Sequence, residues 1–153
     1  MEIVIGSGVD NVLFGFTERQ VVEKLGNPDK VWNIDYGNPE DRDIELTYNE
    51  LRLVLKIEKE NESRLGWIEV HNQNATLWGI HPWRTSKSEL LALLVERLDE
   101  DYEIEEYRSM ECYLFDENWV ELQYEFDRLY CFKLGVLYGE DDQPLWPNRI
   151  GNS

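Results

Sequence analysis

The stretch LFGFTERQVVEKLGNPDKVW, residues 13–32, decides how the rest of the chain is interpreted. Thr17 with Gln20 three residues later is a capping box at a helix start, and Gly26 followed by Pro28 is a helix stop. The helix between them is too short to be stable alone, so its apolar side chains Val21, Val22 and Leu25 must pack on another element. The stretch therefore predicts a short helix that covers a sheet.

Strand-length segments with alternating apolar residues follow this helix. In order they are VWNIDY (31–36), DIELTY (43–48), LRLVLKIE (51–58) and LGWIEVH (65–71). The stretch LWGIHPWRTSKSELLALLVERL (77–98) opens the second half, and within it a second capped helix is predicted to start at Ser86, which forms a capping box with Glu89, and to run through the apolar residues up to Leu98. Four more strand-length segments follow it: YEIEEY (102–107), ECYLFD (111–116), WVELQYEF (119–126) and LYCFKLGVLY (129–138).

This order predicts an α+β fold of two tandem units, each a helix plus a four-stranded antiparallel meander whose sheet is covered on one face by the helix. We expect one compact domain, residues 1–153, with repeats at about 10–75 and 76–138, a short N-terminal segment and a C-terminal tail at 139–153. Identity between the halves is slight, so chance similarity is the alternative to a true duplication.

The first helix region, through Gly15, Thr17, Val21, Leu25, Gly26 and Pro28, resembles the repeat of beta-lactamase inhibitory protein and of the small outer-membrane assembly lipoproteins of the SmpA/OmlA type. Two features depart from that pattern: the chain has no secretion signal, and its two cysteines do not reproduce within-repeat disulfides. The resemblance implies binding through a sheet surface and implies no enzymatic activity.

The charge is strongly negative, with 32 acidic and 15 basic residues and a net charge of −17. Such a field repels nucleic acid and anionic membranes and attracts basic partners. A purely solubilising role is the alternative explanation. The sequence has no signal peptide and no apolar segment long enough for a membrane helix, so we expect a cytoplasmic protein.

Catalytic and metal-binding signatures are missing from the sequence. His71 and His81, with Trp78 and Trp83, could line a pocket between the halves, but a metal needs further ligands, and Glu69 is the only near candidate in sequence. GSG at residues 6–8 is a turn and lacks the pattern of a phosphate loop. Cys112 and Cys131 are expected on strands separated by a third, beyond disulfide reach, as free thiols. We expect no catalytic residue, no metal and no cofactor.

Strand parity predicts an open sheet face. If Val120, Leu122, Tyr124 and Phe126 point toward the helix, the alternate residues of that strand point away. Aromatic anchors among acids suit recognition of a basic protein surface; packing of Trp67 and Trp119 against the other half or the segment PLWPNRI is the alternative. The predicted partner-binding residues are Trp67, Glu69, His71, Trp119, Glu121, Gln123 and Glu125.

An acidic patch follows the second helix, at Asp99, Glu100, Asp101, Glu103, Glu105 and Glu106. Charge on an edge strand prevents sheet-to-sheet pairing, but acids at a helix C-terminus oppose the helix dipole. We expect a non-catalytic module that binds a basic protein, such as an immunity protein or inhibitor acting on a toxin or nuclease. The alternatives are a small hydrolase using carboxylates or histidines between the halves, and a ligand-binding or structural accessory protein. The sequence does not determine the oligomeric state.

Overall fold

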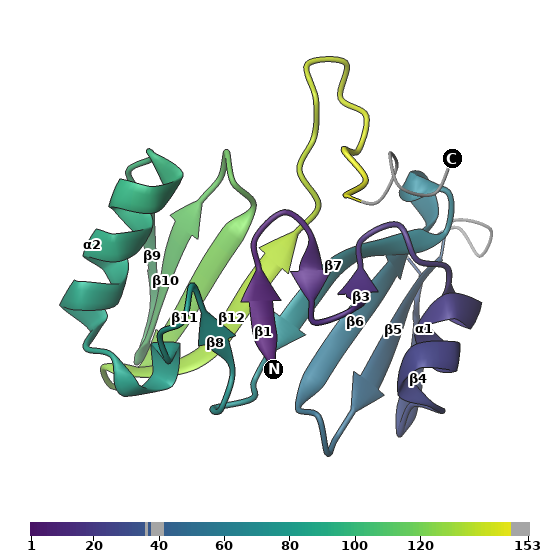
Figure 1. The fold of residues 1–153 in the computed structure, drawn as a ribbon, viewed down its shortest axis with the longest axis horizontal. Coiled ribbons are helices and arrows are strands. Elements are labelled where there is room, and N and C mark those ends of the chain that lie inside the picture. The colour runs from purple at the N-terminus through teal and green to yellow at the C-terminus, as the bar shows by residue number, and fades with distance from the viewer. Residues whose placement is uncertain (36, 38–41, 148–153) are drawn as a thin grey trace.

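The computed structural model describes residues 1–35, 37 and 42–147, and strands dominate its regular structure (Figure 1). The larger of two sheets is antiparallel and has the strand order β4-β5-β6-β7-β12-β11-β10-β9. Its strands are β4 (Lys30–Ile34), β5 (Asp43–Tyr48), β6 (Leu53–Glu58), β7 (Arg64–Val70), β9 (Glu103–Tyr107), β10 (Met110–Phe115), β11 (Val120–Glu125) and β12 (Arg128–Gly135).

A smaller sheet of four short strands has the order β3-β2-β1-β8. Its strands are β1 (Glu2–Val4), β2 (Gly8–Val9), β3 (Val12–Leu13) and β8 (Thr76–Leu77). β1 pairs with β2 in the antiparallel sense and with β8 in the parallel sense. Residues 5–7 form the turn between β1 and β2, so Gly6 and Ser7 of the GSG sequence lie in the turn, as expected, and Gly8 begins β2.

The predicted fold of two tandem helix-and-meander units is wrong. β7 and β12 pair directly, with Val70 opposite Phe132 and Trp67 opposite Gly135, so the two sets of strands form one continuous sheet. This pairing satisfies the backbone groups that both strands would otherwise expose as edges. The sequence also gave no sign of the smaller sheet, because strands of two or three residues are too short to show alternation.

Two α-helices lie in the described part of the chain, α1 (Glu18–Leu25) and α2 (Lys87–Leu98). Thr17 caps α1 through the predicted capping box with Gln20, and Gly26 ends the helix with φ +85°. At the start of α2, the Ser86 hydroxyl accepts a hydrogen bond from the Glu89 N–H, but the Glu89 side chain does not bond back to the Ser86 N–H, so the predicted capping box is only half formed. None of the described helices is long and apolar enough to cross a membrane.

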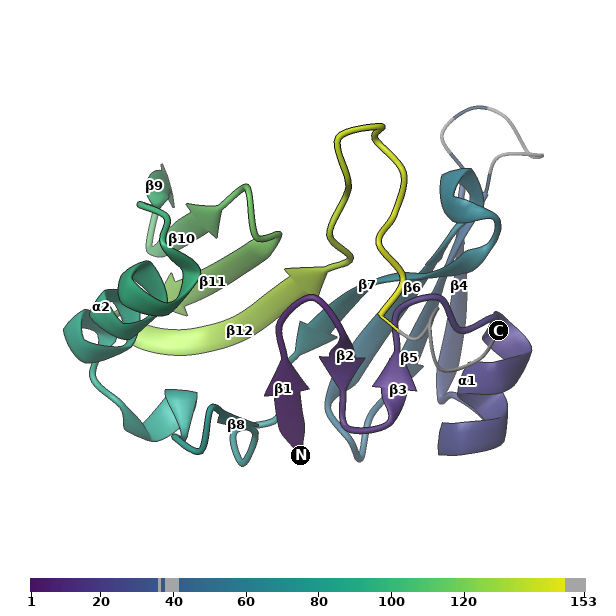
Figure 2. The ribbon, with the colours of Figure 1, turned by 45° about the horizontal axis from the view of Figure 1, so that its top comes forward.

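Both helices and the small sheet lie on one side of the large sheet (Figure 2). We call this side the inner face, and its side chains join those of the helices and small sheet in one core. Register places two rows of apolar residues across it. These rows are Phe115, Val120, Leu134, Ile68, Leu55 and Leu46, and Tyr113, Leu122, Phe132, Val70, Leu53 and Tyr48.

The opposite side, which we call the outer face, carries mostly polar residues. One register row crosses all eight strands through Glu103, Leu114, Glu121, Lys133, Glu69, Val54, Thr47 and Lys30. Phe126 does not follow the predicted inward parity: it lies in the turn after β11 with φ +50° and is 74% exposed. The turn ends the alternation of the strand at Glu125.

Candidate functional site

The predicted partner-binding residues come together around β12. Trp67 and Glu69 belong to β7 and His71 directly follows it, whereas Trp119 directly precedes β11. β12 lies between β7 and β11, so these residues flank one strand. Along β7 and β11, these residues alternate with buried ones, so they lie on the outer face. Glu69 lies there with Trp67 and His71, and β11 contributes Glu121, Gln123 and Glu125.

Trp67 and Trp119 both lie over Gly135. A Cβ at Gly135 would be 2.8 Å from Trp67 Cε3 and 3.3 Å from Trp119 Cε3, so only a glycine leaves room for both rings. The Trp119 ring also lies 5.0 Å from the ring of Tyr138. Packing between residues of the two halves therefore holds both indoles, while Trp119 keeps 41% of its surface exposed.

Trp32 is an outer-face residue that is absent from the predicted partner-binding set. It pairs with Glu45, which pairs with Lys56, which in turn pairs with Trp67, so both tryptophans lie in one row of the outer face. Trp32 is 66% exposed on the edge strand β4. Its face depends on the register between β4 and β5, which the sequence pattern alone does not define.

Four ionisable residues, Glu69, His71, Glu121 and Lys133, form the centre of the outer face. The His71 Nε2 and Glu69 Oε1 atoms are 3.4 Å apart, and the Lys133 Nζ and Glu121 Oε2 atoms are 3.3 Å apart. Burial raises the pKa of Glu69, but the hydrogen bond from His71 and the charge of Lys133 outweigh it, so the pKa is lowered overall. Burial lowers the pKa of Lys133, but Glu69 and Glu121 outweigh it and raise the pKa.

Cys131 adds a thiol to this centre. Its Sγ, an imidazole nitrogen of His71 and a carboxylate oxygen of Glu69 all lie within 4.8 Å of one another. Burial raises the pKa of the Cys131 thiol, and the side chain is inaccessible to solvent, so it is poorly suited to attack a substrate. Glu69 is the only near ligand for His71 along the sequence, because Cys131 comes close to it only through the β7–β12 pairing.

The two cysteines are unpaired in the structure. Cys112 is on β10 and Cys131 on β12, and both pair with Gln123 of the intervening strand β11. The separation by one strand that the sequence predicts is therefore present. Cys112 lies outside the cluster that contains Cys131.

The other predicted histidine lies in a different layer. His81 precedes the 3-10 helix η2 (Pro82–Arg84), which follows β8 of the small sheet, whereas His71 is on the outer face. The His81 Nδ1 and Trp83 Nε1 atoms are buried without a hydrogen-bond partner among the described residues. The Arg97 guanidinium lies over the Trp78 ring, with Cζ 5.2 Å from the ring centroid.

The predicted acidic patch divides into residues with different roles. Glu103 and Glu105 pair with Leu114 and Cys112 and lie on the outer face, but Glu106 pairs with Glu111 and lies on the inner side. Asp99 ends α2 in the left-handed conformation, and Asp101 is exposed. Glu100 accepts hydrogen bonds from Glu117 and Asn118 in the turn before Trp119.

The Glu100 carboxylate accepts hydrogen bonds from two consecutive residues. One oxygen accepts from the Glu117 N–H at 2.8 Å, and the other accepts from the Asn118 N–H at 3.2 Å and from Asn118 Nδ2 at 2.8 Å. Asn118 Nδ2 also donates to the carbonyl of Leu98 at the end of α2. Glu100 therefore has a structural role, which accounts for an acid that is unfavourable to the helix dipole.

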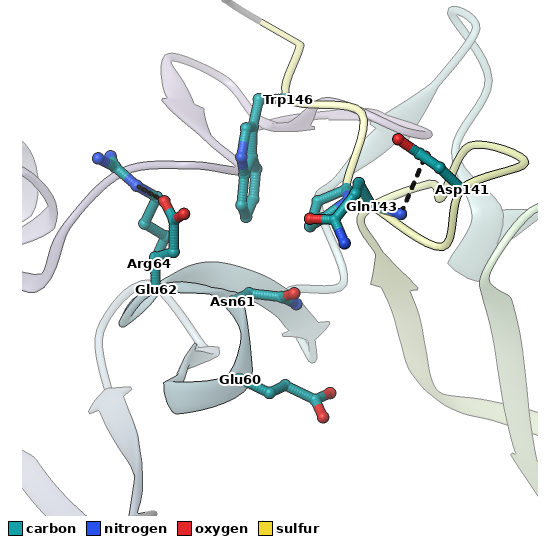
Figure 3. Close-up of a pocket in the computed structure, with 8 residues that line it drawn as sticks. Glu60, Asn61, Glu62, Arg64, Asp141, Gln143 and Trp146 are labelled. Atoms are coloured by element: carbon teal, nitrogen blue, oxygen red, sulfur yellow. Dashed lines mark hydrogen bonds and ion pairs between the residues drawn. The ribbon is translucent and has the colours of Figure 1, made fainter.

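A pocket of about 420 Å³ lies between the C-terminal segment and the 3-10 helix η1 (Lys59–Asn61) (Figure 3). Trp146 forms one wall and packs over Gly15, while the buried Asn61 forms the floor. The Arg64 guanidinium turns toward Glu62 and donates to the carbonyl of Gly15 at 2.9 Å. The remaining residues that line the pocket are Glu60, Asp141, Gln143 and Pro144.

Comparison of the chain with protein-family models, with curated proteins and with solved structures found no match.

Proposed function

We propose that the chain is a non-catalytic module that binds a basic protein through the outer face of its large sheet. The observation that carries the proposal is the outer face itself: Trp67 and Trp119, which pack at Gly135, lie among mostly polar residues on the side of the sheet opposite to both helices. A net charge of −17 favours a basic partner and speeds its encounter.

Aromatic anchors supply the short-range part of the interaction. The exposed surface of Trp119 and the exposed ring of Trp32 lie on this face, and large aromatic side chains dominate protein interfaces energetically. Glu103 and Glu105 supply acidic groups at the β9 end. The acids suit ion pairs at the rim of an interface, which affect association rate more than affinity.

An immunity protein or inhibitor that neutralises a cytoplasmic toxin or nuclease fits this combination. The resemblance of the first helix region to the repeat of beta-lactamase inhibitory protein adds support, because that resemblance implies recognition through a sheet surface. A nuclease is itself basic where it binds nucleic acid, so an acidic face can occupy the same surface.

A capture experiment with matched variants tests the proposal. The immobilised chain is exposed to lysate of its source cell, and bound proteins are compared at low and moderate salt. We expect a basic protein whose capture is weakened by salt, by Trp119→Ala and by Glu103→Lys, because the last two change the outer face.

Glu96→Lys is the matched control, because it makes the same charge change at an exposed position on α2. Equal loss with Glu96→Lys and Glu103→Lys would show that only net charge matters. Capture that is insensitive to salt and to Trp119→Ala would contradict the proposal.

A further inference from the structure

We propose that Glu69, His71 and Cys131 form a binding site for a divalent transition-metal ion, with Zn²⁺ as the best match. Glu69 and His71 are two positions apart and share the outer face of β7 and its continuation. Cys131 is on the adjacent strand β12, where the pairing of Phe132 with Val70 brings it beside His71. The site thus takes two ligands from one strand and the third from its neighbour.

The distances suit a tetrahedral ion. Zn²⁺ bonds of about 2.0–2.3 Å to oxygen, nitrogen and sulfur place neighbouring donor atoms roughly 3.3–3.8 Å apart. The His71 Nε2 and Glu69 Oε1 atoms already lie 3.4 Å apart, and all three donor atoms are within 4.8 Å of one another. A side-chain adjustment of about 1 Å closes the set.

The donor types select the metal. Thiolate and imidazole are poor ligands for Mg²⁺ and Ca²⁺, whereas one sulfur, one nitrogen and one oxygen suit Zn²⁺. Three protein ligands leave a fourth position for water or another ligand. The side chains of Glu69 and His71 are 23% and 27% exposed, so the ion enters from the outer face.

The surrounding charges balance when the ion binds. A dication with the Glu69 carboxylate, the Cys131 thiolate and neutral His71 has no net charge, and Lys133 is paired with Glu121. The ion itself drives loss of the thiol proton. Lys133 also stabilises the charge of Glu69 when no ion is bound, so it competes with the metal. The ring of Tyr130 lies edge-on to His71 at 5.4 Å and holds the imidazole in place.

This site lies within the surface that we propose for partner binding but does not depend on it. Metal binding is measured on the purified chain alone, so failure of one proposal is distinguishable from failure of the other. A Co²⁺ titration gives a spectroscopic test, because thiolate coordination produces a charge-transfer band in the near ultraviolet, and Zn²⁺ affinity is measured by competition with a chromophoric chelator.

We expect one equivalent of Co²⁺ to produce the thiolate band, and Zn²⁺ to displace it. Cys131→Ser should abolish the band, and His71→Ala should weaken Zn²⁺ binding by at least about tenfold. Cys112→Ser is the matched control, because Cys112 lies outside the cluster, and it should keep both signals. Circular dichroism identifies a variant that fails to fold, in which case His71→Ala, at a partly exposed position, decides the outcome.

Absence of the band in the unmodified chain overturns the proposal, as does a band that survives Cys131→Ser or disappears with Cys112→Ser. Zn²⁺ affinity unchanged by His71→Ala overturns it as well.

Discussion

Trp67 and Trp119 meet over a single glycine, Gly135, in the strand between them. One tryptophan comes from the first set of strands and the other from the second, so their common position at Gly135 depends on the β7–β12 pairing that joins the large sheet. The two indoles therefore pack as a unit around position 135, and this packing requires a residue without a side chain there.

Gly135→Ala is expected to destabilise the fold by about 1–3 kcal/mol, because the added methyl group overlaps Trp67. Urea unfolding followed by circular dichroism measures the change. In a Trp67→Ala background the space is free, so the same substitution should cost much less. An equal cost in both backgrounds would show that the overlap with Trp67 is not its source.

The two capped helices were predictable from sequence because their signals are local. Thr17, Gln20 and Gly26 lie within one short stretch, and the hydrogen bonds of the capping box connect residues three positions apart. Alternation likewise assigned Trp67 and Glu69 to the open face, because a strand with one buried face has a period of two.

The joining of the strands was not predictable because it depends on long-range pairing. No local pattern specifies that Val70 lies opposite Phe132, and the same alternation fits two separate sheets or one continuous sheet. The proximity of Cys131 to His71 and the shared row of Trp32 and Trp67 follow from such pairings. For this reason the candidate metal site and one exposed aromatic residue were missed.

Glu100→Ala should remove the hydrogen bonds that the carboxylate accepts from Glu117 and Asn118. We expect a loss of about 1–3 kcal/mol, since charged acceptors make stronger hydrogen bonds than neutral ones. The turn also positions Trp119, so its fluorescence should shift toward that of a solvent-exposed indole. Glu103→Ala, at an exposed acid on β9, should cost no more than about 0.5 kcal/mol. Equal costs for the two variants would contradict the assigned role of Glu100.

Tyr138→Phe tests the attachment of the segment after β12 to η1. The buried Asn61 side chain donates to the Tyr138 hydroxyl at 2.8 Å and to Glu58 Oε1 at 2.9 Å. Loss of the hydroxyl leaves one of these donors without its acceptor, so we expect destabilisation of about 1–2 kcal/mol. Thermal unfolding measures it, with Tyr130→Phe at an exposed tyrosine as the control. No difference between the variants would show that this hydrogen bond contributes nothing to stability.

Tyr124→Phe should change how stability depends on alkaline pH. Burial raises the pKa of the Tyr124 hydroxyl from 10.0 to about 12. Above pH 10 the unfolded chain loses this proton while the folded chain keeps it, so the free energy of unfolding decreases as pH rises toward 12. Phenylalanine has no such proton, so the variant should lose less stability across that range.

The hydroxyl of Tyr124 is also buried without a hydrogen-bond partner among the described residues, so its removal at pH 7 should leave stability unchanged or raise it by up to about 1 kcal/mol. Urea unfolding at pH 7, 10 and 11 measures both effects. A variant that is destabilised at pH 7, and that loses as much stability as the unmodified chain between pH 10 and 11, would show that the hydroxyl has a favourable partner and that another group controls the alkaline transition.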